Sequence, residues 1–335
     1  MSIVELIQAA RDPLSAADTT TLFDAILAGQ VAESDLTVYL SATADRKPTV
    51  DELVGAVTSM RRHMHPVEAP GGAVDLCGTG GDGLGTLNIS TAVSFVVAAL
   101  GVPVAKHGNR SASSRSGAAD TLEEMGIRLN QNPDAASRIL RDAGMAFLFA
   151  QTHHPAMRHA ATARRQIGRR TIFNLLGPLA NPASVTRQLV GVFSADWLTP
   201  YAQALNILGS KHAWIVHGDD GLDEISISGP SRVAVLKDGN ISQMEITPED
   251  AGLQRQPLRE LVGGDARHNA DALRHLLQGN GVAAYHAVIV LNSAAALIVA
   301  DKARNLREGA DMADAAIRDG RARAAFEKFL MASNA

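Results

Sequence analysis

The first 70 residues carry apolar positions at helical spacing and show no strand-like alternation. Leu22, Phe23 and Ile26 recur on one helical face, and a glycine follows as a natural helix stop. Residues 49–52, Thr-Val-Asp-Glu, form a capping box that predicts the start of another helix. We expect a small all-helical N-terminal domain, which buries little surface by itself and therefore docks on a larger body or a second subunit.

From Val74 onward, strand-like and helix-like segments alternate. This alternation predicts a mainly parallel sheet with helices on both faces. The last two strands are joined by Lys-Asp-Gly-Asn, and Asp-Gly is a hairpin signal, so that edge of the sheet is predicted to be antiparallel. The expected strands are 74–77, 102–105, 145–149, 188–193, 212–217, 231–236 and 241–246.

The remaining periodic segments predict helices, and two irregular segments separate the domains. Residues 66–72 and 171–186 are rich in residues that interrupt regular structure, and we expect the chain to cross between domains there. The predicted fold is α/β, with a helical domain over residues 1–70, completed by part of 165–186, and a large α/β domain over 73–335. The expected helices of the large domain are 91–100, 118–125, 133–143, 156–166, 197–208, 270–277 and 282–300.

Composition excludes several function classes. A net charge of −4 over 335 residues argues against a protein that binds nucleic acid through bulk positive charge. Cys77 is the only cysteine, which excludes an internal disulfide and fits a reducing compartment. The N-terminal residues lack a secretory signal, and polar residues interrupt the apolar stretch 282–300, which predicts a buried helix. We expect a cytoplasmic protein with neither a membrane nor a nucleic acid as partner.

A glycine-rich turn lies between the first predicted strand and a helix. Four of the six residues 78–83 are glycines, and backbone can wrap closely around phosphate oxygens only where side chains do not intrude. The following helix offers free N–H groups and a positive dipole end, and Asn88, Ser90 and Thr91 add donors. The alternative is a capped tight turn, for which four glycines are excessive. The spacing fits neither the dinucleotide fingerprint nor a Walker loop.

Two cations follow the second predicted strand. Lys106 and Arg110 stand at its carboxyl end, where ligands bind in open α/β sheets. Beside a phosphate-binding turn they would balance a polyanion, and Ser111, Ser113 and Ser114 offer further hydroxyl donors. The alternative is a solvated basic loop, which the nearby glycine turn makes less favourable.

Acidic residues follow the strand that ends near residue 217. Four acids occur within residues 219–224, and the pair Asp223 and Glu224 closes this group. Oxygen ligands of this kind suit Mg²⁺ that bridges to substrate phosphates. The alternative is a solvated acidic loop.

The segment after the third strand combines histidines with arginines. His153 and His154 precede a proline, which indicates a helix entry, and no third ligand stands at metal-site spacing. Arg164 on the following helix could hold a carboxylate in bidentate fashion, whereas the default reading of a single arginine is a surface charge.

Together these residues resemble a known family. GTGGDG, NIST, KHGNRxxSSxSG, HPAM with a downstream arginine, TIFNLLGPLANP and GLDEIS occur in this order with suitable gaps. Over nearly its whole length the chain is similar to the anthranilate phosphoribosyltransferases, and few other enzymes share GTGGD with KHGN. The resemblance implies a fold of the nucleoside phosphorylase and phosphoribosyltransferase type, a hinge active site, and a homodimer formed through the helical domain.

The resemblance also implies a reaction. The phosphoribosyl group of 5-phosphoribosyl 1-pyrophosphate would pass to the amine of anthranilate with the aid of Mg²⁺, giving N-(5-phosphoribosyl)anthranilate and pyrophosphate in the second step of tryptophan biosynthesis from chorismate. Catalysis would be electrostatic, through Lys106 and the metal, without a covalent nucleophile.

Site residues follow from the same resemblance, position by position. Ser90, Asp223 and Glu224 would contact Mg²⁺. The anthranilate site would contain Gly78, His107, Asn109, His154, Met157 and Arg164, with Arg164 on the carboxylate. The phosphoribosyl pyrophosphate site would contain Gly78, Gly81, Asp82, Thr86, Asn88, Ile89, Ser90, Thr91, Lys106, His107, Gly108, Asn109, Arg110, Ser111, Ala112, Ser113, Ser114 and Ala118.

Two positions depart from the family pattern, and two rival functions remain. Many members have a serine in place of Ala118 and some a tyrosine in place of Met157, so we expect one contact to the phosphoribosyl donor to be weaker and the outer anthranilate site to differ. A pyrimidine nucleoside phosphorylase shares the two-domain plan but needs no acidic pair for a metal. A nucleic-acid-binding protein on the same scaffold would need a strongly basic groove.

Overall fold

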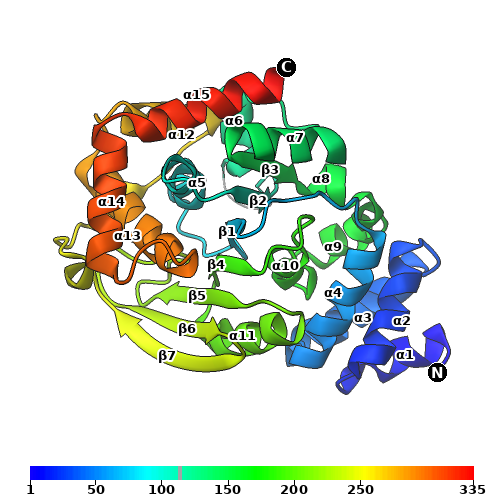
Figure 1. Cartoon of the computed structure of the whole chain (residues 1–335). Helices are drawn as coiled ribbons and strands as arrows, with labels where there is room; N and C mark the ends of the chain where they lie inside the picture. Colours follow the sequence, from blue (N-terminus) through cyan, green and yellow to red (C-terminus); the bar gives the residue numbers. More distant parts are fainter. Residues whose placement is uncertain (112–114) are drawn as a thin grey trace.

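The computed structural model describes residues 1–111 and 115–335, which form a bundle of helices beside a larger body built on a sheet (Figure 1). Ser2 and Glu5 form a capping box at the first helix, and Thr49 and Glu52 form the predicted one at the fourth. The bundle consists of α1 (Ile3–Gln8), α2 (Ala16–Leu27), α3 (Glu33–Arg46) and α4 (Val50–His63).

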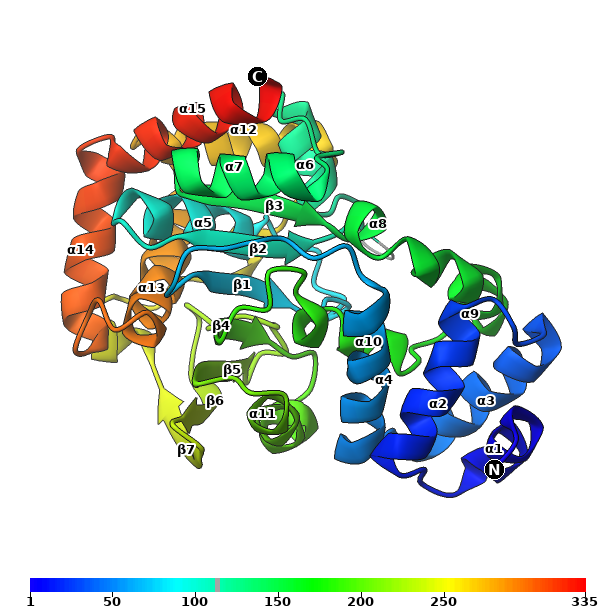
Figure 2. The same ribbon diagram turned by 45° about the vertical axis from the view of Figure 1, so that its right-hand side comes forward.

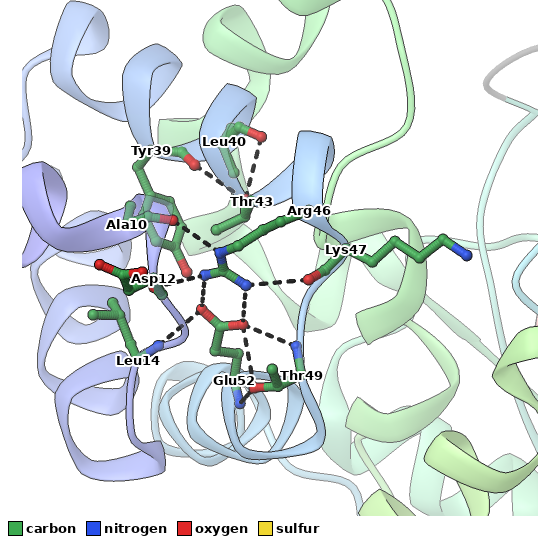
Figure 3. A network of polar contacts seen from close by, with 10 residues as sticks. All are labelled: Ala10, Asp12, Leu14, Tyr39, Leu40, Thr43, Arg46, Lys47, Thr49 and Glu52. Atoms are coloured by element: carbon green, nitrogen blue, oxygen red, sulfur yellow. Dashed lines mark hydrogen bonds and ion pairs between the residues drawn. The ribbon is translucent and has the colours of Figure 1, made fainter.

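A buried ion pair fixes the connection between α3 and α4 (Figure 3). The guanidinium of Arg46 donates two hydrogen bonds to the carboxylate of Glu52, one of them 2.8 Å long, and one of 3.0 Å to the carbonyl of Ala10. The carboxylate also accepts from the amides of Leu14 at 3.3 Å and Thr49 at 2.9 Å. The side chain of Glu52 is 0% exposed, so its carboxylate has no contact with water. The hydrogen bonds of this network replace those that water would make to the charge.

The described residues form a seven-stranded sheet in the order β3-β2-β1-β4-β5-β6-β7. The first five strands are parallel, and the β6–β7 edge is the predicted antiparallel hairpin, with Asp238 at φ 47° and Gly239 at φ 83° in its turn. The strands are β1 (Val74–Gly78), β2 (Val104–Gly108), β3 (Met145–Phe149), β4 (Arg187–Gly191), β5 (His212–Gly218), β6 (Ser231–Lys237) and β7 (Asn240–Ile246).

Strand β2 differs from the prediction. The sequence places a strand over 102–105 and a cationic loop after it, whereas Val104 pairs with Met145 and the strand continues to Gly108. Lys106 is therefore a strand residue with 2% exposure. A charged residue normally marks a strand end, but this ammonium group donates to the carbonyl of Leu76 inside the protein, which makes its burial tolerable.

Side chains alternate between the two faces of the sheet. On β5, Trp214 and Val216 pack on one face, and Ala213 and Ile215 pack on the other. The first face is covered by α5, α7 and α13, with α15 packed on α5 and α7, and the second by α11, on which α4 of the bundle packs (Figure 1). The helices are α5 (Ile89–Ala99), α6 (Ala118–Glu124), α7 (Pro133–Ala143), α11 (Leu198–Ile207), α12 (Ala266–Leu277), α13 (Ala283–Val299), α14 (Leu306–Arg318) and α15 (Arg321–Asn334).

Two of these helices lie outside the predicted set. The sequence interpretation stops at residue 300, although α14 begins at an N-cap in which the Asn305 side chain accepts from the amide of Glu308 at 2.9 Å. The predicted buried helix over 282–300 is confirmed as α13. Among the described residues, no helix has the length and apolar character needed to cross a bilayer.

Residues 64–73 lead from the bundle to the body without a helix, as predicted for 66–72, whereas the second crossing runs largely through short helical pieces (Figure 2). The predicted helix over 156–166 is split, because a 3₁₀ turn precedes its α-helical part. Phe173, Leu176 and Leu179, in the segment expected to be irregular, are buried. These pieces are α8 (Ala150–His153), η2 (Pro155–Ala160), α9 (Ala161–Ile167), α10 (Phe173–Leu176) and η3 (Pro178–Ala180).

Candidate functional site

A cavity of about 1200 Å³ opens at the carboxyl ends of β1 and β2 and extends to α9. Every described residue of the predicted site lines it, although the segments lie far apart in the sequence. Ala112, Ser113 and Ser114 lie outside the described residues. The lining set is Gly78, Gly81, Asp82, Thr86, Asn88, Ile89, Ser90, Thr91, Lys106, His107, Gly108, Asn109, Arg110, Ser111, Ala118, His154, Met157, Arg164, Asp223 and Glu224.

The glycine turn follows directly on β1. Gly80, Gly81 and Gly83 have φ values of 65°, 79° and 81°, a region that side chains disfavour. Helix α5 then begins without a side-chain cap from Asn88. Successive amides in such a turn, followed by a helix N-terminus, can bind anionic oxygens.

Two glycines let the acidic loop approach these strand ends. A Cβ atom at Gly78 would lie 2.8 Å from a carboxylate oxygen of Asp223, and one at Gly191 would lie 1.5 Å from its carbonyl oxygen. With glycine at both positions, the Asp223 carboxylate accepts a hydrogen bond of 2.9 Å from the amide of Gly80. The acidic loop and the glycine turn are therefore one structural unit.

Three carboxyl groups gather at this point. Burial raises the pKa of Asp223 to about 7, and the neighbouring Asp82 adds to the rise. Burial likewise raises the pKa of Glu224 to about 8, with repulsion from Asp223 as the next cause. One carboxylate oxygen of Asp82 is buried without a hydrogen-bond partner among the described residues. Such a cluster is stabilised by a cation.

The oxygen atoms of this cluster suit Mg²⁺, which is bound partly by its substrate, better than a metal ion that is bound by protein side chains alone. Within residues 1–111 and 115–335, no group of three or more His, Cys, Asp and Glu side chains is arranged to hold a metal ion. Mg²⁺ typically takes one or two carboxylates and completes its shell with water and substrate phosphates. Asp223 and Glu224 could supply the carboxylates, and the hydroxyl of Ser90 lies on the same wall.

The other acids of the turn have different partners. Asp219 forms an ion pair of 2.9 Å with Arg232. Asp220 accepts hydrogen bonds of 2.5 Å from both Ser226 and Ser228. The four acids therefore do not act together, and Asp223 and Glu224 are the ones that line the cavity.

Lys106 lies beneath the turn, beside a buried acid that the sequence interpretation missed. Its Nζ donates a hydrogen bond of 3.0 Å to Ser90, and burial lowers its pKa while Asp75 opposes this. Asp75 is 0% exposed and accepts from the amide of His107 at 3.0 Å. The sequence feature that could have indicated the importance of Asp75 is an acidic residue among the apolar residues of a predicted strand.

Arg110, which is predicted to help balance a polyanion, is already paired with acidic residues. Its guanidinium forms ion pairs with Asp120 at 2.8 Å and Glu123 at 2.6 Å, and it lies 5.6 Å from the ring centre of Phe149. The charge of this side chain is already balanced.

Histidines form the middle of the cavity wall. The rings of His107 and His154 lie 5.1 Å apart, and each ring bonds a backbone carbonyl at 2.9 Å, of Gly177 and Ala180 respectively. Burial lowers the pKa of His154 to about 4 and that of His107 well below its usual value, so both are neutral near pH 7. The two imidazole rings therefore give the cavity polar groups that carry no charge.

Arg164 on α9 also lines the cavity. Its guanidinium stacks 5.2 Å from the ring centre of Phe173, and burial lowers its pKa. No carboxylate of the described residues lies within ion-pair distance of it. A partly buried, unpaired cation of this kind is suited to binding an anionic ligand.

Other contributors carry no recognisable motif. Residues 261–264 lie along residues 85–87, with the amide of Leu87 bonded to the carbonyl of Leu261 at 2.8 Å. Arg170 donates to the carbonyl of Gly81 and stacks 4.1 Å from the ring centre of Phe193. Further cavity-lining residues that the sequence interpretation did not single out are Arg115, Gln151, Asn174, Val262, Gly263, Gly264 and Asn269.

The chain matches two family models that correspond to its two parts. Residues 4–64 match the helical bundle domain of a glycosyl transferase family, and residues 70–323 match the α/β domain of the same family. The anthranilate phosphoribosyltransferase of Beijerinckia indica is 53% identical over 96% of this chain and 94% of its own length. That of Azorhizobium caulinodans is 52% identical over 93% and 91%.

Solved structures agree in fold. The anthranilate phosphoribosyltransferase of Thermus thermophilus is 37% identical, with a TM-score of 0.94 over 98% of this chain and 99% of that one. That of Saccharomyces cerevisiae in complex with PRPP and Mg is 27% identical, with a TM-score of 0.90 over 99% and 96%. The predicted fold class is confirmed, and the chain belongs to the anthranilate phosphoribosyltransferase family.

Proposed function

We propose that the cavity binds phosphoribosyl pyrophosphate at the glycine turn and anthranilate near Arg164. The chain transfers the phosphoribosyl group to the amine of anthranilate, giving N-(5-phosphoribosyl)anthranilate and pyrophosphate in tryptophan biosynthesis. The observation that carries this proposal is the continuity of one cavity from a glycine turn with acidic neighbours to Arg164, which has no acidic partner among the described residues. A yeast relative contains PRPP and Mg, and another structure of it contains 4-fluoroanthranilate.

The part of the cavity around the glycine turn, where phosphoribosyl pyrophosphate binds, stabilises the leaving group. As the bond from the ribose carbon to pyrophosphate breaks, negative charge grows on the pyrophosphate. Amides of the glycine turn other than those of Thr79 and Gly80, which bond Gly191 and Asp223, would stabilise this charge. Lys106, held by hydrogen bonds to Ser90 and to the carbonyl of Leu76, adds a positive charge below the turn. Mg²⁺, held by Asp223, Glu224 and Ser90, supplies further charge neutralisation when bound.

The part of the cavity around Arg164, where anthranilate binds, orients the amine. Arg164 pairs with the carboxylate of anthranilate, and the neutral His107 and His154 add no positive charge beside the ribose carbon. An aromatic amine is already unprotonated near neutral pH, so no strong general base has to activate it. The proton that the nitrogen loses as the new N–C bond forms passes to the departing pyrophosphate or to solvent. The buried crossing segments exclude water, which would otherwise attack the same carbon.

Anthranilate fluorescence tests the proposed function. Purified protein, Mg²⁺ and phosphoribosyl pyrophosphate should consume anthranilate, with pyrophosphate released in equal amount. A chain that leaves anthranilate unchanged, but cleaves a pyrimidine nucleoside with inorganic phosphate, would instead be a nucleoside phosphorylase.

Replacement of Arg164 by alanine should raise the KM for anthranilate by about 10-fold or more, because a charge-assisted bond in a partly buried site is lost. The matched control is Arg165→Ala, since the guanidinium of Arg165 bonds the hydroxyl of Thr162 at 3.1 Å on an exposed surface. Steady-state kinetics with each substrate varied separately measure both variants. A defect confined to kcat would contradict the role of Arg164 in anthranilate binding.

We also propose that the chain works as a cytoplasmic homodimer, with residues 1–70 and part of 165–186 acting as the helical domain. Val4 on α1 and Val38 on α3 are each 57% exposed, which supports this bundle as the contact surface. A monomer in sedimentation velocity at micromolar concentration would contradict the dimer. Fractionation of cells tests the location, for which the unpaired Cys77 is the support.

A further inference from the structure

Asn269 on α12 lies 181 positions from Asn88 in the sequence but contacts its side chain at the cavity wall. We infer that Asn269 is a positioning residue, which orients the side-chain amide of Asn88 so that its NH₂ group faces the bound pyrophosphate. The inference rests on the proposed function, because it assumes an anionic donor at the glycine turn.

The orientation starts from a group that can only donate. The backbone amide of Gly264 donates a hydrogen bond of 2.8 Å to Oδ1 of Asn269. This bond determines which end of the Asn269 amide is oxygen, because an N–H group cannot accept. Its Nδ2 therefore points the other way and donates to Oδ1 of Asn88 at 3.1 Å. Asn269 is 2% exposed, so water does not compete for these positions.

A second donor acts on the same oxygen. The hydroxyl of Thr121 donates to Oδ1 of Asn88 at 2.6 Å, and the hydroxyl of Tyr285 donates to the backbone carbonyl of Asn88 at 3.2 Å. Thr121 and Tyr285 are both buried. With two donors on its oxygen, the Asn88 amide has one favourable orientation. Among the described residues its Nδ2 has no acceptor, so its two N–H groups can bind a ligand.

Asn88 lies at a position where the N–H groups of its side chain could bind an anionic ligand. It is the residue before α5, lines the cavity, and makes no side-chain cap bond to its own helix. An amide turned by 180° would present oxygen to an anionic ligand, so it would lose a donor and add repulsion. The contacts that prevent this come from α6 and α12, which no pattern around residue 88 reveals.

The first test replaces Asn269 with aspartate or alanine. Asn269→Asp keeps the acceptor for Gly264 but places an oxygen against Oδ1 of Asn88, and Asn269→Ala removes the contact without adding charge. The Kd of phosphoribosyl pyrophosphate with Mg²⁺, measured by calorimetry, should rise by about 10-fold or more for both variants. The KM for anthranilate should stay within about twofold.

Two controls separate this role from general damage. Asn132→Asp changes an exposed asparagine whose side chain accepts from the amide of Ala135 at 2.8 Å, and should leave the Kd unchanged. Thr121→Val removes the other donor with little change of shape and without charge, and should raise the Kd by about threefold or more. It decides the question if the Asn269 variants do not fold.

A double-mutant cycle gives the decisive result. In an Asn88→Ala background, Asn269→Ala should have no further effect on the Kd, because its effect acts through Asn88. An equal loss of affinity in both backgrounds, or an unchanged Kd in Asn269→Ala and Thr121→Val, would overturn the inference. Unmodified protein that binds the donor but leaves anthranilate unchanged would overturn the proposed function instead, while these Kd comparisons still decide the role of Asn269.

Discussion

The double variant Asp223→Asn with Glu224→Gln should lower kcat by about 100-fold or more, while the KM for anthranilate changes little. The two carboxyl groups lie against the glycine turn, where burial raises the pKa of each, and a cation relieves this cost. Without their charge the site loses its affinity for Mg²⁺, and the leaving pyrophosphate is less stabilised. Anthranilate is held near Arg164 and keeps its contacts.

The acidic loop offers a matched control for this prediction. Asp219→Asn removes a carboxylate from the same loop, but one that pairs with Arg232 outside the cavity. Initial rates at a series of Mg²⁺ concentrations should show a loss for the double variant alone. Wild-type turnover of the double variant at saturating Mg²⁺ would refute the metal assignment.

Glu52→Gln should lower the free energy of unfolding by about 3–5 kcal/mol, which is the usual effect of removing one partner from a buried ion pair. The Glu52 side chain is 0% exposed and that of Arg46 17%, so the remaining guanidinium cannot recover full hydration (Figure 3). Urea unfolding followed by circular dichroism measures the change, and kinetics of the folded variant should remain near normal because the pair lies outside the cavity.

The same pair predicts a pH dependence. Burial alone would raise the pKa of Glu52, but hydrogen bonds from Arg46 and Thr49 outweigh it and hold the pKa below the ordinary value of 4.5. A carboxylate with a lowered folded-state pKa stabilises the protein above its unfolded pKa, and this contribution disappears as the pH falls through the folded value. The difference between wild type and Glu52→Gln should therefore shrink below pH 4.5.

An exposed pair provides the comparison. Asp319 and Arg321 form an ion pair of 2.8 Å on the surface, with side chains 48% and 47% exposed. Asp319→Asn should leave the unfolding midpoint unchanged, because water solvates the remaining charge. If Glu52→Gln behaved in the same way, the buried network would contribute nothing to stability.

Local patterns were sufficient for much of the fold. The period of apolar residues and the Asp-Gly hairpin predicted the strands, the mainly parallel order and the antiparallel edge, because these features depend on neighbours in the sequence. The glycine turn and the Asp223–Glu224 pair were recognisable because a phosphate site restricts which residue types can stand side by side. The β2 boundary was wrong, since the sequence does not show that Lys106 finds a carbonyl inside the protein.

The sequence by itself determined which chemical groups the chain carries and, for most of them, the element in which each one lies, with Lys106 on β2 as an exception. Only the tertiary structure decided which of them face the cavity and which are already paired. Arg110 and Arg164 are both arginines near a predicted site, yet one is neutralised by Asp120 and the other has no acidic partner among the described residues. Asn269 of α12 and Thr121 of α6 both reach the side chain of Asn88, because α12 packs beside α6. Contacts of this kind join residues that are distant in sequence, so their geometry depends on packing that no local pattern encodes.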